Sequence, residues 1–286
     1  MAITIYDRRA IAGIRRASRA AAATLASVGA RLEPGVTTAM IDRWVREDTA
    51  RRGGRPSQLG YHGFPASVCT SRNDVICHGI PSDDVALRDG DIVNVDVTTE
   101  LDGFHGDTSA TFYIGEPSED AKRVVETARR CLELGIEQVR PGAYVGDIGA
   151  AIQEYAESQG CSVVRDFVGH GIGRQFHMEP SIPHYGTRGK GVKLKAGMVF
   201  TIEPMINLGD YETELQADRW TVLTRDRSLS AQFEHTILVT RSGVEVLTTR
   251  GKRLVNSEDK PWSALGPLST PAALPAEAGD RRVVNG

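Results

Sequence analysis

The sequence has little of several features that mark particular classes of protein. Its four cysteines, Cys69, Cys77, Cys131 and Cys161, form no CxxC pair and lack the density of a secreted scaffold, which indicates a thiol-reducing compartment. No apolar run approaches the ~20 residues that cross a bilayer. A net charge of −3 gives the chain no overall positive charge that would indicate nucleic acid as a partner. These absences predict a cytoplasmic protein without a membrane anchor or a nucleic-acid partner.

The composition that is present is that of a folded chain. Of its 286 residues 40% are hydrophobic and 25% are charged, which is typical of a globular protein with a substantial core. After Asn256 four prolines stand among alanine, serine and acidic residues, a composition that favours disorder. We therefore expect one folded domain over residues 1–255 and a disordered tail over residues 256–286.

A pattern recurs along the chain at an offset of 107 positions. Residues 87–96 and 194–203 both read leucine, a basic residue, any residue, glycine, and then a β-rich run that ends in an acid. At the same offset Pro34-Gly35 matches Pro141-Gly142. Each copy predicts a helix, a Pro-Gly turn, a second helix, a loop and a strand. The sequence thus predicts two half-repeats, at about residues 10–115 and 117–250.

The N-terminal segment resembles a transit peptide in composition, because six arginines and no acid lie between Asp7 and Glu33. Its apolar residues nevertheless follow the helical period, as do those of the matching segment in the second repeat. A cleaved targeting peptide would have no such internal counterpart. We therefore assign this segment to the fold.

Two acids meet in a predicted β-hairpin. If its two-residue loop is 101–102, Asp96 faces Asp107; if the loop is 102–103, Asp96 faces Ser109 and Asp107 is a diagonal neighbour on the same face. A three-residue loop would break this parity. Like charges so close destabilise a sheet, and a bound divalent cation is the simplest compensation. Two solvated acids would be the alternative if the pair stood alone.

The repeat and a glycine-rich segment supply three more candidate ligands. Glu203 occupies the strand position equivalent to Asp96, and Glu234 lies in a strand-like run late in the second half. His170 belongs to the segment 169–177, whose glycine spacing is not that of a phosphate loop. Two aspartates, two glutamates and one histidine suit divalent manganese, iron or cobalt, and zinc also. Because metal-bound water is nucleophilic near neutral pH, the set predicts hydrolysis.

These residues and the motifs around them resemble the type I methionine aminopeptidases, a branch of peptidase family M24. The resemblance spans residues 11–247 and implies an α+β pita-bread fold, with two pseudo-symmetric halves and a central antiparallel sheet flanked by helices. The motifs that carry it are Tyr61-His62-Gly63-Phe64-Pro65, Cys77-His78-Gly79-Ile80-Pro81, Asn94-Val95-Asp96-Val97, Gly103-Phe104-His105-Gly106-Asp107-Thr108, Thr201-Ile202-Glu203-Pro204-Met205 and the run from Ser228 to Thr236.

The resemblance implies a role for each ligand in a centre of two divalent ions, which would be Co, Mn, Fe or Zn. Asp107 and Glu234 would bridge the ions, Asp96 would chelate one, and His170 with Glu203 would complete the other. A hydroxide between the ions would attack the first peptide carbonyl, with Glu203 as the proton shuttle.

The resemblance also implies two catalytic histidines and a substrate pocket. His78 would contact the scissile amide nitrogen and His177 would polarise the carbonyl, whereas the remaining four histidines, His62, His105, His184 and His235, are interpreted as packed or surface residues. The methionine side chain would enter an apolar pocket lined by Tyr61, Phe64, Cys69, Phe176 and Trp220.

Two further features follow from comparison with the family's usual residues. Gln58 stands where many members have a smaller residue and Phe64 where some have tyrosine, so that pocket selectivity is left open. Similar enzymes hold a monovalent cation near the positions of Asn73, Val75 and Ser230.

The implied function is removal of the initiator methionine from nascent proteins whose second residue is small, by a monomer that would meet the ribosome through its catalytic domain. One alternative is a proline-directed peptidase of the same fold, although such enzymes usually carry an extra N-terminal domain. Two others are a non-catalytic pita-bread protein that binds RNA, ribosomes or regulatory partners, and a creatinase-like metal-free hydrolase. The presence of all five ligands disfavours the last two.

Overall fold

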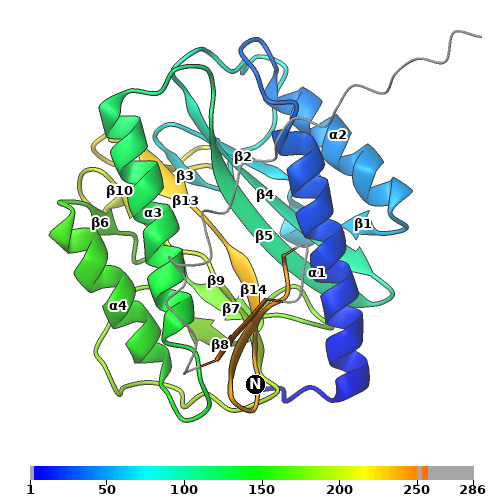
Figure 1. Cartoon of the computed structure of the whole chain (residues 1–286). Helices are drawn as coiled ribbons and strands as arrows, with labels where there is room; N and C mark the ends of the chain where they lie inside the picture. The colour runs from blue at the N-terminus through cyan, green and yellow to red at the C-terminus, as the bar shows by residue number, and fades with distance from the viewer. Residues whose placement is uncertain (1–2, 250–252, 257–286) are drawn as a thin grey trace, which may run out of the picture.

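The computed structural model describes residues 3–249 and 253–256, in which sheets lie between two pairs of helices (Figure 1). None of the described helices is both long and apolar enough to traverse a bilayer. The tail expected after Asn256 lies outside the described residues. The helices are α1 (Arg8–Gly29), α2 (Thr38–Arg51), α3 (Glu119–Glu137) and α4 (Val145–Ser158), with a short 3₁₀ turn η1 (Tyr61–Gly63).

The described strands form antiparallel sheets. In the first, β4 (Ile92–Leu101) pairs with β5 (Phe104–Tyr113), β1 (Arg55–Pro56) and β2 (Cys69–Arg72). The second has the order β16 (Arg253–Asn256), β15 (Gly243–Val246), β14 (His235–Val239), β9 (Val199–Ile202), β7 (Gly169–Gly171) and β8 (Met178–Ile182). Two smaller sheets have the orders β13 (Ser230–Gln232), β10 (Met205–Asn207), β6 (Ser162–Val163), and β11 (Thr213–Leu215), β12 (Val222–Thr224), β3 (Val75–Cys77).

The first helix of each half begins at a side-chain cap and buries an apolar stripe. Asp7 accepts a hydrogen bond from the backbone N–H of Ala10 at 2.8 Å, and Ser118 accepts one from that of Ala121 at 3.1 Å. The stripe of α1 packs against the valines of β4, whereas α3 and α4 pack on the β13–β10–β6 sheet and on strands of the larger sheet. The N-terminal segment is therefore part of the fold, as the repeat predicted.

The two halves share backbone geometry at the offset found in the sequence. Both ends of α4 lie 107 positions after the ends of α2. The isolated bridge between Thr37 and Ala86 has its counterpart, at that offset, between Tyr144 and Lys193. Figure 1 shows α1 and α2 on one side of the strands and α3 and α4 on the other. The fold consists of two pseudo-symmetric halves.

The β4–β5 hairpin adopts the second of the two predicted registers. Asp102 and Gly103 form the loop with φ of 53° and 75°, the positive values that a type I′ turn requires. Asp96 consequently faces Ser109, and Asp107 faces the residue two positions further along β4. Both carboxylates thus lie on one face of the sheet.

Two predicted strand runs are shorter than the sequence suggested. β9 ends at Ile202, one residue before Glu203. Glu203 is followed by Pro204, which has no N–H with which to continue the ladder. The run ending at Val239 divides into β13, which pairs with β10, and β14, which pairs with β9. Glu234 lies at this change of partner, where its backbone N–H donates to the carbonyl of Ser109 at 3.0 Å.

The glycine-rich segment expected as a loop contains the short strand β7. A Cβ on Gly169 would lie 2.5 Å from the carbonyl oxygen of Thr201, and one on Gly171 would lie 2.2 Å from that of Glu179. The glycines therefore permit strands to approach closely around His170.

Candidate functional site

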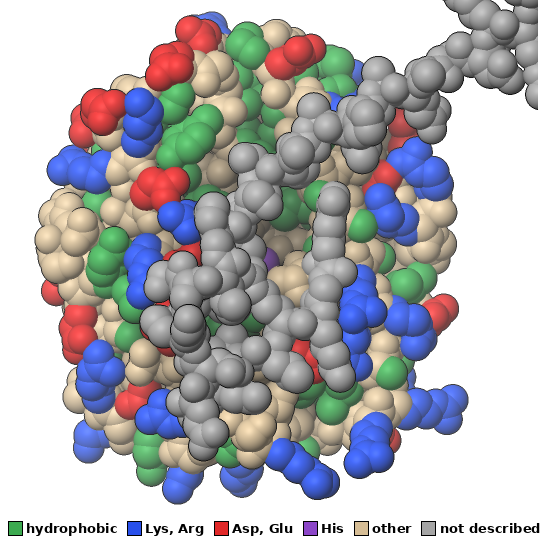
Figure 2. Space-filling model, in the orientation of Figure 1, with side chains coloured by type: hydrophobic (Ala, Val, Ile, Leu, Met, Phe, Trp, Pro, Cys, Tyr) green, Lys and Arg blue, Asp and Glu red, His purple; other side chains and the backbone are tan. Residues whose placement is uncertain are grey.

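All the predicted catalytic, substrate-binding and divalent-metal residues line one cavity, whereas Asn73, Val75 and Ser230, predicted near a monovalent cation, do not line it. Its volume is about 220 Å³. A histidine is visible near the centre of the face drawn in Figure 2. The predicted residues that line the cavity are Tyr61, Phe64, Cys69, His78, Asp96, Asp107, His170, Phe176, His177, Glu203, Trp220 and Glu234.

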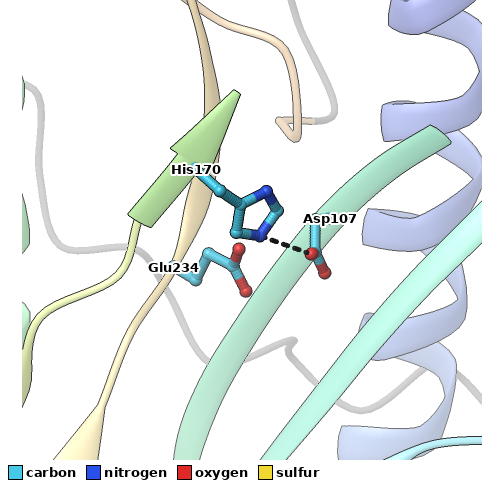
Figure 3. Close-up of side chains that lie close together, drawn as sticks. All are labelled: Asp107, His170 and Glu234. Carbon is cyan, nitrogen blue, oxygen red and sulfur yellow. Dashed lines mark ion pairs between the residues drawn. The ribbon is translucent and has the colours of Figure 1, made fainter. Parts of the chain in front are cut away.

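The five predicted ligands come from both halves of the molecule. Asp96 and Asp107 project from β4 and β5, His170 from β7, and Glu203 and Glu234 from the ends of second-half strands. Ligand atoms of Asp107, His170 and Glu234 all lie within 4.8 Å of one another (Figure 3). The imidazole Nε2 of His170 is also 3.5 Å from Oε1 of Glu203. The side chains could therefore share bound ions.

Neighbouring side chains orient two of the carboxylates. The hydroxyl of Thr98 donates to Oδ1 of Asp107 at 2.6 Å. The hydroxyl of Thr201 donates to Oε1 of Glu203 at 2.7 Å, and the Gln232 amide donates to the other oxygen at 3.3 Å. Such donors fix the direction in which each carboxylate presents its remaining lone pairs.

The acids form a concentration of buried negative charge that no Lys or Arg among the lining residues balances. Burial raises the pKa of Asp96 to about 7 and that of Glu203 to about 8. It also raises the pKa values of Asp107 and Glu234, which are raised further by the neighbouring acids. Within the described residues Oδ1 of Asp96 and Oε1 of Glu234 have no hydrogen-bond partner. Divalent metal ions fit this site because they would balance the charge and bind the unpartnered oxygens.

His170 presents the lone pair that a metal requires. Its Nδ1 lies 3.1 Å from the carbonyl oxygen of Gly171, so Nδ1 carries the proton and Nε2 faces the acids. Burial lowers the pKa of His170 to about 4. The imidazole is therefore neutral at pH 7, and its 3.7 Å contact with Asp107 does not join two full charges.

His177 is hydrogen-bonded to Tyr61 at the cavity. Its Nδ1 lies 2.8 Å from the hydroxyl of Tyr61. Burial raises the pKa of Tyr61 and lowers that of His177, so both groups are neutral at pH 7. With the phenol as the donor, the proton of the imidazole resides on Nε2; with Nδ1 as the donor, Nε2 carries a lone pair. The ring of His177 also stacks on Phe176, with centroids 4.0 Å apart.

His78 follows β3 in a left-handed backbone conformation, with φ of 56°, which is uncommon for a residue other than glycine. Its ring contacts the ring edges of Phe167 and Trp220, with centroids 5.4 and 6.1 Å away. Burial lowers the pKa of His78. A neutral, polar group is thereby placed in an aromatic wall.

A small hydrophobic cluster forms an apolar wall of the same cavity. Phe64 and Trp220 meet edge to face with centroids 5.1 Å apart. Burial raises the pKa of the Cys69 thiol well above its usual value, which keeps it uncharged. The cluster consists of Phe64, Ala66 and Cys69, with Ile80 and Trp220 packed against it.

Several lining residues were not assigned to the site from the sequence. Val168, Met205 and Gln232 each lie two positions from a predicted ligand, and the period of an extended chain could have indicated them. Phe167 carries no such signal. The full set is Gln58, His62, Cys77, Phe167, Val168, Met205 and Gln232.

The histidines interpreted as packed or surface residues divide into two groups. His62 lines the cavity, whereas His105, His184 and His235 are not among the lining residues. His184 is buried and accepts a hydrogen bond at Nε2 from the backbone N–H of Glu203 at 3.0 Å. It therefore supports a ligand from outside the cavity.

Comparison with known proteins gives the same picture of the chain. Residues 12–241 match the metallopeptidase family M24. Methionine aminopeptidase A of Synechocystis is 55% identical over 246 residues, which cover 86% of this chain and 97% of that protein. The crystal structure of methionine aminopeptidase from Rickettsia prowazekii is 50% identical, with a TM-score of 0.85 over 87% of this chain and all of that one. Prolidase from Pyrococcus furiosus, 21% identical with a TM-score of 0.71 over 86% of this chain and 66% of its own, shares the fold alone.

Proposed function

The chain belongs to metallopeptidase family M24, and on that premise we propose that it removes the N-terminal methionine from nascent proteins whose second residue is small. It is an enzyme of the methionine aminopeptidase type, because relatives of that name are about half identical to it along almost their whole length. The observation that carries the chemistry is the cluster of four carboxylates, two buried and two half-buried, and one neutral histidine at one cavity.

Family membership and the donor set both indicate that the protein binds divalent metal. We propose two ions, with Asp107 and Glu234 shared between them, Asp96 on one side, and His170 with Glu203 on the other. When bound, such ions supply Lewis-acid polarisation and activation of water. The proposed metals are Co, Mn, Fe or Zn.

We also propose a monovalent cation near Asn73, Val75 and Ser230. The carbonyl of Asn73 accepts a hydrogen bond from the Ser230 N–H at 2.9 Å, and Val75 begins β3. These contacts bring the backbone of two of the three residues together.

The remaining polar residues would bind the peptide and move protons. The Nε2–H of His177 would donate to the oxygen of the scissile carbonyl, and His78 would contact the scissile amide nitrogen. Glu203 would take a proton from the attacking water and pass it to the leaving amine. All four carboxylates would keep their ligand role.

The methionine side chain would enter the apolar part of the cavity. This part offers four aromatic rings and a thiol to a flexible thioether, from Tyr61, Phe64, Phe176, Trp220 and Cys69. Phe64, Cys69 and Phe176 are buried and Tyr61 and Trp220 are half-buried, so a side chain bound among them would lose its hydration shell.

The substrates of this type of enzyme are the N-termini of newly made proteins. We propose further that the protein acts as a cytoplasmic monomer and meets those chains at the ribosome. In this proposal residues 1–255 are a single catalytic domain whose half-repeats span about 10–115 and 117–250.

The deciding experiment is methionine release from Met-Ala-Ser and Met-Leu-Ser by chelator-stripped protein, after Mn, Co, Fe or Zn is added back singly under anaerobic conditions. We expect metal-dependent release from the first peptide and little from the second. Asp107→Asn is the matched control, since it should abolish release and weaken metal binding while leaving the circular dichroism spectrum unchanged.

Three outcomes would redirect the proposal. Release with no added metal, or full activity in Asp107→Asn, would contradict the assignment of the centre. No release with any metal from folded protein would favour a non-catalytic role. Cleavage of proline-flanked peptides in place of Met-Ala-Ser would indicate the proline-directed alternative.

A further inference from the structure

One edge of β4 has a break in its strand pairing beside the metal centre. β5 pairs with β4 along the whole of the other edge. On the broken edge, followed along β4, the pairing with β2 stops at Asp96, which faces Cys69. The pairing with β1 starts at Thr99, which faces Pro56. The two β4 residues between these pairs have no strand partner on that edge, so their peptide groups need another one.

The side chain of Gln58 fills this break. Its Oε1 accepts a hydrogen bond from the backbone N–H of Thr98 at 3.2 Å, and its Nε2 donates to the carbonyl oxygen of Asp96 at 3.0 Å. The backbone N–H of the preceding Ser57 donates to the Thr98 carbonyl at 2.9 Å. The primary amide thus replaces a backbone peptide and continues the β1 pairing as far as Asp96.

The stretch of β4 that Gln58 holds carries two groups of the site. One is the carboxylate of Asp96. The other is the hydroxyl of Thr98, which donates to Oδ1 of Asp107 at 2.6 Å. A shift of this short stretch would therefore displace both aspartates at once. Gln58 is only 4% exposed, so water does not compete freely for its hydrogen bonds.

We propose that Gln58 is a positioning residue of the metal centre, which sets the placement of Asp96 and Asp107 by bonding the β4 backbone on which both depend. The inference rests on the proposed function only in taking the two aspartates as ligands. Gln58 also lines the cavity. The length of its side chain is therefore constrained by the two hydrogen bonds to β4 and by the space at the cavity wall.

The direct test is hydrogen exchange on metal-stripped, full-length protein. Gln58→Met keeps the length of the side chain and removes both hydrogen bonds. We expect the Thr98 amide to exchange at least tenfold faster in this variant, while the amides of β5 keep their protection. Leu59→Ala is the matched control, because Leu59 is the next residue and is 46% exposed. Unchanged protection of Thr98 in Gln58→Met would overturn the proposal.

The functional consequence is measured by calorimetric titration of Mn into the same stripped proteins. Since partners of metal ligands typically contribute 10–100-fold to affinity, we expect Gln58→Met to bind Mn at least tenfold more weakly and Leu59→Ala to bind it as the parent does. Equal affinity in the parent and Gln58→Met would contradict the positioning role. If Gln58→Met fails to fold, Gln58→Asn, which is too short to reach both partners, takes its place.

The two proposals can fail separately. If the parent protein released no methionine, the proposed function would be wrong, yet the exchange and Mn results would still decide the role of Gln58. In active protein, we expect Gln58→Met to lower kcat for Met-Ala-Ser more than it changes KM. A change confined to KM would show that Gln58 acts only as pocket wall, and would refute the positioning role.

Discussion

At the scale of single residues, the contact between Tyr61 and His177 determines which nitrogen of an imidazole faces the cavity. The hydroxyl and Nδ1 are 2.8 Å apart, although the residues are 116 positions apart in the chain. We expect the phenol to donate, which leaves the proton on Nε2, where a substrate carbonyl could accept it. Tyr61, predicted as a pocket residue, would then also orient His177, which is predicted to be catalytic.

We expect Tyr61→Phe to lower kcat for Met-Ala-Ser about 3- to 10-fold, the effect of one neutral hydrogen bond, with KM changed less than twofold. The phenylalanine ring keeps the packing on Phe176, whose centroid is 4.8 Å from that of Tyr61. Steady-state kinetics measures the split, and nitrogen-15 NMR of His177 reports the tautomer. An unchanged kcat, or an unchanged tautomer, would show that the hydrogen bond does not direct the imidazole.

The sequence indicated candidate residues more readily than their contacts. Acids and histidines within specific motifs could be identified as ligands because metal chemistry restricts residue type. The partners that orient them, such as Gln232 on Glu203 and the hydroxyl of Tyr61 on His177, depend on tertiary distances that no local pattern records. The assigned roles of all these residues stay predictions until they are tested by mutation.

At the scale of elements, the closeness of α1 to β5 depends on a glycine. A Cβ on Gly106 would lie 2.2 Å from the backbone nitrogen of Ser18, in the middle of α1. Gly13, on the facing side of the helix, would instead place a Cβ 2.4 Å from the ring of Phe104. The first obstacle is main chain and cannot rotate away, whereas the second is a side chain.

Gly106→Ala should therefore destabilise the protein by about 3 kcal/mol or more, in the range of severe overpacking. Gly13→Ala should have a smaller effect, because the gain in helix propensity of about 1 kcal/mol offsets part of the clash. Urea unfolding of both variants gives the comparison. The same loss of stability in both, or a smaller one in Gly106→Ala, would be inconsistent with backbone contact as the cause.

How well the elements could be predicted depended on how local their determinants are. The Asp102-Gly103 loop was one of two registers that the alternation allowed, and the pairing of Leu101 with Phe104 identifies it as the one adopted. The preference of type I′ turns for Asp-Gly could have indicated it from the sequence. The break at Glu234 could not be predicted, because it arises where the chain changes from β10 to β9 as its partner. Partner choice between strands is a property of the assembled sheets.

At the scale of the whole molecule, the buried acids make stability depend on pH and metal together. A carboxyl group whose pKa is higher in the folded state stabilises that state at low pH, and this contribution is lost as pH rises through the folded pKa. Burial raises the pKa of Asp96 from 3.8 to about 7 and that of Glu203 from 4.5 to about 8. Burial lowers the pKa values of His170 and His184 from 6.5 to about 4 and about 3. Because the unfolded chain binds protons at these histidines more readily, they destabilise the folded state as pH falls toward and below 6.5.

Between pH 7.5 and 8.5 the histidines are almost neutral in both the folded and the unfolded state, so the raised pKa values of the acids dominate, and metal-stripped protein should lose about 1 kcal/mol of stability or more across that range. Divalent metal bound to the folded state should reverse the trend, because ionised carboxylates bind it more tightly as pH rises. Urea unfolding at three pH values, with and without Mn, tests both statements. A flat or rising stability of the stripped protein would contradict the assignment of raised pKa values.

The distribution of the proposed ligands along the chain also sets a sequence of events during synthesis. A ribosome makes Asp96 and Asp107 early, while the cavity still lacks every group from the second half, and it makes Glu234 only after β13. An unfinished chain therefore contains no complete hydrolytic centre. The protein should gain its activity only after residue 234 has been made, and a product terminated before that residue should have none.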